Sequence, residues 1–131
     1  MKASLTVLAG GFVLLAALPA LAHHSVAAEF DASKRFTVTG KVTKVEWANP
    51  HIWFYVAVEE GGKTVQYQFE GGPPNTLRRQ GWTRNSMQEG DVITVANSMR
   101  AKDGTNTGNA GTVTLANGKR LFAGSNEDNA K

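Results

Sequence analysis

Apolar and polar residues alternate with a period of two through much of the chain after residue 35, which is typical of strands with one buried face. The alternation is cleanest over 64–70. The residues of this segment expected to face the core are Val65, Tyr67 and Phe69, and those expected to face solvent are Gln66, Gln68 and Glu70. Further strands are predicted over 36–48, 51–60, 91–100 and 111–116, with a short last strand at 119–123.

The first predicted strand changes its buried face part-way along its length. Its apolar residues are Phe36, Val38 and Val42 on one parity and Val45 and Trp47 on the other. Gly40 lies inside the run. A change of parity beside a glycine predicts a bulge or a sharp bend, as the corner of a barrel requires.

Glycine, asparagine and proline separate the strands. The predicted tight turns are Asn49-Pro50, Gly61-Gly62 and Asn117-Gly118. A Gly-Gly-Pro-Pro run at 71–74 ends the third strand. After it a short helix is predicted over 76–80, with Asn75 as its N-cap and Gly81 at its end.

The expected order is three strands, a short helix, two strands and a short sixth. This order, with a bent first strand, predicts an all-β OB-like barrel of five to six strands, with a small β-sandwich as the alternative fold. Residues 23–35 are expected to be a lead-in and 101–110 a loop rich in Gly and Asn. The prediction is one domain over 23–124, followed by a disordered polar tail at 125–131.

The first 22 residues have the pattern of a cleavable signal peptide. Lys2 precedes an apolar run, and Ala20-Leu21-Ala22 forms a small-x-small cleavage signature. The run at 5–18 is shorter than the about 20 residues of a spanning helix, which disfavours the alternative of an uncleaved anchor. Since the chain has no Cys, export without disulfides indicates the bacterial periplasm. We expect a periplasmic protein with no transmembrane segment after cleavage.

The charge balance argues against a nucleic-acid partner. Without Lys2 the chain has 13 Lys and Arg against 11 Asp and Glu, so the net charge is only about +2. The densest basic stretch is Arg78, Arg79 and Arg84. Nucleic-acid-binding domains usually concentrate basic residues on one surface, and this stretch is too thin to indicate one.

Several short motifs together resemble a family of small exported bacterial proteins of unknown function. They are His23-His24-Ser25, Glu29-Phe30, Gly40-x-Val42-x-x-Val45-x-Trp47-x-Asn49-Pro50-His51, Gly81-Trp82-x-Arg84, Gly90-Asp91 and Lys102-Asp103-Gly104. The resemblance covers essentially the whole chain after the signal peptide. It implies periplasmic residence and a compact β domain, and it brings no known activity or ligand.

The three histidines suggest a metal site. Cleavage after Ala22 would make His23 the terminal residue, whose amine and ring nitrogen can chelate one ion. With nitrogen from His24 or His51 this set suits Cu(II), as in the histidine brace of exported copper proteins. Zinc is the second choice. The alternative interpretation is structural, with His23 and His24 solvated and His51 bonded within its own turn.

Exposed aromatic residues suggest a different function, non-catalytic binding of an unknown small ligand or periplasmic protein. OB-folds bind extended ligands across one face of the barrel. The candidates are Trp53 and Tyr55 on the outward parity of the second strand, with Trp82. No nucleophile elbow or nucleotide motif is present, so we favour binding over catalysis. An oxidative copper enzyme is a lesser variant of the metal hypothesis.

Overall fold

The computed structural model describes residues 25–125. The predicted signal peptide at 1–22, the metal candidates His23 and His24, and the predicted tail beyond Ser125 lie outside the described residues. No helix within 25–125 is long and apolar enough to cross a membrane.

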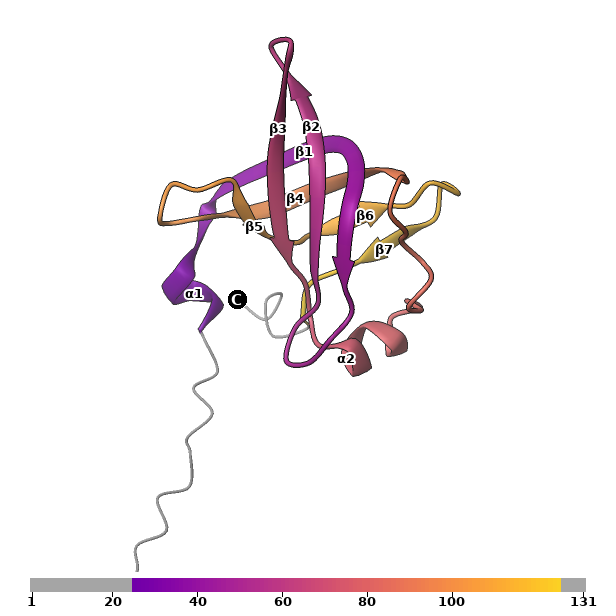
Figure 1. Cartoon of the computed structure of the whole chain (residues 1–131). Helices are drawn as coiled ribbons and strands as arrows, with labels where there is room; N and C mark the ends of the chain where they lie inside the picture. Colours follow the sequence, from indigo (N-terminus) through magenta and orange to yellow (C-terminus); the bar gives the residue numbers. More distant parts are fainter. Residues whose placement is uncertain (1–24, 126–131) are drawn as a thin grey trace, which may run out of the picture.

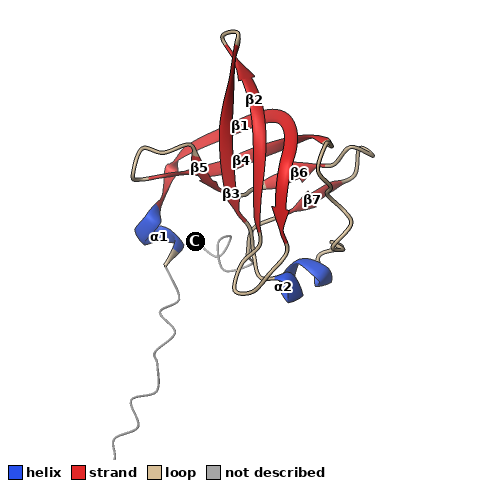
Figure 2. Ribbon diagram, in the orientation of Figure 1, coloured by secondary structure: helices blue, strands red, loops and turns tan. Residues whose placement is uncertain are grey.

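Strands dominate the described chain, and two short helices lie outside the wall that the strands form (Figure 2). In chain order the elements are α1 (Val26–Glu29), β1 (Phe30–Glu46), β2 (Trp53–Glu60), β3 (Lys63–Glu70), α2 (Pro74–Arg79), β4 (Val92–Ala101), β5 (Thr107–Asn109), β6 (Thr112–Thr114) and β7 (Arg120–Phe122).

The strands close into a five-stranded barrel (Figure 1). The sheet order is β1-β2-β3-β5-β4-β6-β7, and an additional pairing of β1 with β4 closes the ring. β3 and β5 are parallel, and α2 lies between β3 and β4 in the chain. This order confirms the predicted all-β, OB-like barrel over the alternative β-sandwich. β6 and β7 extend the sheet beyond β4.

β1 is the strand that allows the ring to close. Its 17 residues pair with β4 over the first part and with β2 over the last part. At Gly40 the wall bends so closely that an added Cβ would lie 2.2 Å from the Ala57 carbonyl oxygen. The predicted bend is therefore at Gly40. The register shifts of β1 lie on both sides of it, between Asp31 and Arg35 and between Phe36 and Val38 against β4, and between Val42 and Lys44 against β2.

The core contains the apolar face of each long strand. In β2 and β3 the Phe54 and Phe69 rings are fully buried and stack with centroids 5.2 Å apart. Leu77 of α2, also fully buried, belongs to the same cluster. α2 lies at the lower end of the barrel in Figure 1, so its apolar side closes that end.

Four boundaries differ from the sequence-based prediction. β1 begins at Phe30, within the supposed lead-in, because Phe30 packs with Met99 and Ala101 in a second, smaller cluster. The predicted loop at 101–110 contains β5. The strand predicted over 111–116 is reduced to β6. Helix α2 begins at Pro74 after Pro73, so Asn75 is inside the helix and is not its N-cap.

Candidate functional site

The outer face of β2 carries two partly exposed aromatic side chains. Trp53 and Tyr55 alternate with the buried Phe54 and Val56, so both rings lie on the outside of the barrel. Successive residues of a strand rise about 3.3 Å, which places the two side chains about 7 Å apart along β2. The register sets Tyr55 between Lys44 of β1 and the β3 strand.

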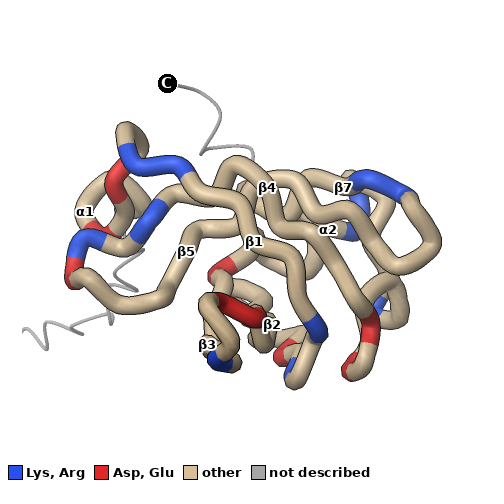
Figure 3. Tube along the Cα trace, turned by 90° about the horizontal axis from the view of Figure 1, so that it is seen from above, with Lys and Arg blue, Asp and Glu red and all other residues tan. Residues whose placement is uncertain are grey.

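The charges on this face neutralise one another. Lys44 Nζ lies 2.5 Å from Glu46 Oε1 and 5.5 Å from the centre of the Tyr55 ring. The Tyr55 hydroxyl donates to Glu46 Oε2 at 3.5 Å. The hydrogen bond to Glu46 raises the pKa of Lys44 above its usual value, as expected for a paired ammonium group. Around this face, basic and acidic residues are interspersed (Figure 3).

Carboxamides and hydroxyls border the aromatic pair. Gln66 Nε2 donates to Thr43 Oγ1 at 2.6 Å, and Gln68 Nε2 donates to Thr107 Oγ1 at 2.8 Å. The first bond reaches over β2 from β3 to β1, and the second joins the neighbouring strands β3 and β5. The face therefore combines apolar rings with neutral polar groups, and we call Trp53, Tyr55, Gln66, Gln68 and the Lys44–Glu46 pair the aromatic face.

Trp82 is not part of the aromatic face. It is 2 % exposed and belongs to the main core cluster. Its Nε1 donates to the Phe122 carbonyl at 2.7 Å, which ties the segment after α2 to β7. Trp82 was expected to offer an exposed ring to a ligand, but the structure buries its side chain in the main core cluster.

His51 pairs with a carboxylate that was expected to face solvent. Its Nδ1 bonds Glu70 Oε1, and the side chains are 24 % and 9 % exposed. Glu70 is the last residue of β3, where the Gly71 amide donates to the Ile52 carbonyl and brings the two segments together. Glu70 keeps the outward parity of Gln66 and Gln68, but its burial corrects the prediction that it faces solvent. His51 therefore bonds to Glu70 and not, as the structural interpretation expected, within its own turn.

Residues 11–110 match a protein family of unknown function, DUF6152. The chain belongs to the DUF6152 family. No curated protein and no solved structure matches it. Membership of DUF6152 agrees with the expected resemblance to an uncharacterised family, and the aromatic face and the His51–Glu70 pair are the features of this member that offer chemistry.

For this DUF6152 chain, the metal hypothesis depends on residues that the structure does not describe. Within 25–125 no group of three or more His, Cys, Asp or Glu side chains is arranged to hold a metal ion. His51 and Glu70 supply two such groups. His23 and His24 lie outside the described residues, so their part in a metal site stays a prediction.

Proposed function

We propose that this DUF6152 protein is a non-catalytic binding module of the bacterial periplasm and that its aromatic face holds a neutral oligosaccharide. The carrying observation is the pair of partly exposed rings of Trp53 and Tyr55 beside two oriented carboxamides. The signal-peptide pattern at 1–22 supports the compartment.

The chemistry of the aromatic face favours a sugar over a charged polymer. The C–H faces of sugar rings are apolar and pack on aromatic rings, whereas their hydroxyls need donors and acceptors at the ring edge. Trp53 and Tyr55 supply the aromatic rings. Gln66 and Gln68 supply the hydrogen-bond donors and acceptors. The ammonium group of Lys44 is already paired with Glu46, so the face offers little attraction to a polyanion. Oligosaccharides are among the ligands that OB-folds bind on strands two and three.

The test is calorimetric titration with soluble neutral oligosaccharides of glucose and N-acetylglucosamine. Trp53→Ala and Tyr55→Ala should each weaken binding by about tenfold or more, since each removes a stacking surface. Val92→Ala is the matched control, because Val92 is an exposed apolar residue on β4 and outside the aromatic face. Equal affinities in all three variants, or saturation by none of the sugars, would contradict the proposal.

A second candidate is copper binding by His51 with the amino terminus at His23, and the His51–Glu70 pair is the observation that favours it. A carboxylate on one ring nitrogen of a histidine orients the ring and makes the other nitrogen a better ligand. With Nδ1 held by Glu70, Nε2 of His51 is the nitrogen left for a metal ion. The planar nitrogen set suits Cu(II) better than Zn(II).

The copper proposal is tested by Cu(II) titration of protein secreted natively and confirmed by intact mass to begin at His23. One-to-one binding should weaken in His51→Ala, and by about 10–100-fold in Glu70→Gln. One additional residue before His23 should abolish tight binding, because it removes the free amine from the chelate. Binding that is indifferent to both His51→Ala and the added residue would rule this site out.

A further inference from the structure

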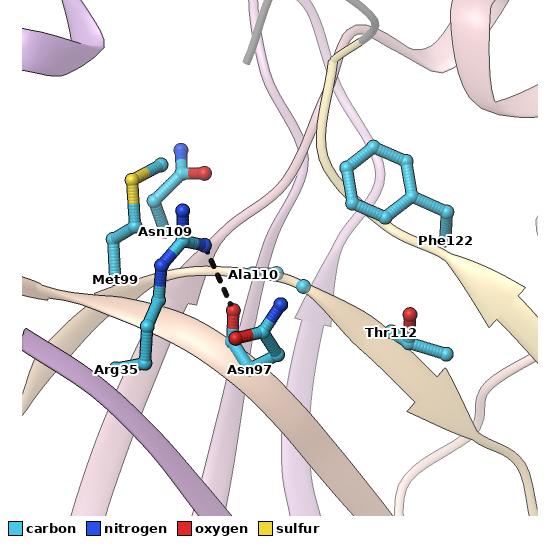
Figure 4. A pocket seen from close by; sticks show the side chains of 8 residues that line it. Arg35, Asn97, Met99, Asn109, Ala110, Thr112 and Phe122 are labelled. Atoms are coloured by element: carbon cyan, nitrogen blue, oxygen red, sulfur yellow. Dashed lines mark hydrogen bonds between the residues drawn. The ribbon is translucent and has the colours of Figure 1, made fainter. Parts of the chain in front are cut away.

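A small pocket on another part of the barrel is lined by an arginine and by the amide of an asparagine (Figure 4). Its volume of about 30 Å³ has room for about two water molecules. Strands β1, β4, β5, β6 and β7 contribute to its wall, so it is separate from the aromatic face. The lining residues used below are Arg35, Asn97, Met99, Asn109, Thr112 and Phe122.

Backbone carbonyl groups hold the Arg35 side chain in place, and no carboxylate of the described residues neutralises its charge. Its Nε donates to the Ala32 carbonyl at 3.0 Å and its Nη1 to the Asn97 carbonyl at 3.1 Å. Both acceptors are neutral backbone groups, and no acidic residue lines the pocket. The remaining N–H groups of the guanidinium are available, and its positive charge has no ion-pair partner among the described residues.

Asn109 gives the second, independent indication of a ligand. It is 4 % exposed, and its carboxamide makes no hydrogen bond to a residue within 25–125. Because the rest of the residue is buried, its carboxamide can meet a further hydrogen-bond partner only through the pocket that it lines. Figure 4 shows the Asn109 and Arg35 side chains together on one side of the pocket and the Phe122 ring on the other.

The conformation of Asn97 is unusual as well. Its φ of 58° lies in the left-handed region. Among the described residues, all others with a positive φ are glycines. Asparagine tolerates this conformation better than most residues do. The same residue presents the carbonyl that accepts from Arg35, so the local backbone contributes to the position of the guanidinium.

We propose that this pocket binds a single carboxylate group. Its two oxygens would occupy this space and accept hydrogen bonds from the guanidinium of Arg35 and the amide of Asn109. A planar carboxylate matches the fork of donors on an arginine. Phosphate and sulfate are not planar, and they carry no carbon substituent that the apolar side of the pocket could contact. The Phe122 ring and the Met99 side chain line the same pocket and can contact the carbon next to the carboxylate.

Two sources of such a carboxylate are distinguishable. Acetate and propionate represent small organic acids, and acetylated dipeptides with a free or an amidated C-terminus represent peptide ends. Each is titrated into the full secreted protein at constant ionic strength and followed by heteronuclear NMR. We expect saturable one-to-one binding in the millimolar range, and weaker binding of inorganic phosphate, which has no carbon substituent to contact Phe122 and Met99. A dipeptide that binds tighter than acetate only with its free C-terminus identifies a peptide end, and equal binding of all carboxylates identifies a small acid.

Two variants and one control test the residues. Arg35→Met should weaken acetate binding by about tenfold or more, since a charge-assisted pair is lost. Asn109→Asp has the same shape but places a carboxylate beside Arg35, and it should abolish binding while the fold is retained. Arg120→Met removes an exposed arginine of β7 outside the pocket lining and should change nothing. Acetate affinity that is the same in Arg35→Met, Asn109→Asp and Arg120→Met would overturn the proposal, as would phosphate binding as tightly as acetate.

Discussion

Trp82→Phe separates a structural role of this residue from a role in ligand binding. The substitution keeps an aromatic ring in the core but removes the Nε1–H that donates to the Phe122 carbonyl at 2.7 Å. Loss of that bond costs about 1 kcal/mol. Because Trp82 is 2 % exposed, the smaller ring also leaves a cavity worth about 1–2 kcal/mol. The free energy of unfolding should therefore fall by about 2–3 kcal/mol, which corresponds to about 10–20 °C in Tm.

The assay is urea denaturation followed by far-UV circular dichroism, with ligand titration of the same preparations. Trp53→Phe is the matched control, because it makes the same chemical change on the outer side of β2 and should cost less than about 1 kcal/mol. Trp82→Phe should leave oligosaccharide affinity unchanged. The reasoning is refuted if Trp82→Phe is no less stable than Trp53→Phe, or if it loses the ligand while keeping full stability.

Three further predictions concern the barrel itself. Gly40→Ala should lower the free energy of unfolding by more than about 2 kcal/mol, because its Cβ would meet the Ala57 carbonyl, and a calorimetric Tm equal to that of the parent would contradict this. Leu77→Ala should cost about 2–5 kcal/mol in urea denaturation, since Leu77 is fully buried where α2 closes the barrel, and a cost below 1 kcal/mol would show that α2 is dispensable. The hydrogen bond to Glu60 raises the pKa of Tyr67 above 10, so this bond stabilises the protein below pH 10 and the contribution is lost as the pH rises through the folded-state pKa. Unfolding free energies measured between pH 8 and 12 should show that loss in the parent and not in Tyr67→Phe.

Strand faces could be predicted from the sequence because they depend on neighbours along the chain. The period of two in β3 identifies Tyr67 and Phe69 as core residues, and both are buried. The barrel could also be predicted, from the order of the elements and from Gly40. A glycine inside an apolar strand usually marks a bulge, a tight bend or a close approach of another backbone. On the aromatic face, parity alone placed Trp53 and Tyr55 outward.

Other features arise only when distant segments meet. The Thr-Gly-Asn segment of β5 has no strand pattern. It becomes a strand because it lies between β3 and β4 and pairs with both of them. Gly108 is required there, since an added Cβ would lie 2.7 Å from the Phe36 ring.

Side-chain periodicity is a local property of the chain, so most of the long strands, their buried faces and the bend at Gly40 could be predicted from the sequence alone. The tertiary structure decided which polar groups are buried and with what partner. Glu70 is buried against His51, and Asn109 faces the same pocket as Arg35, although each pair is far apart in the chain. Burial of a polar side chain depends on the segment that covers it, and that segment is set by closure of the barrel.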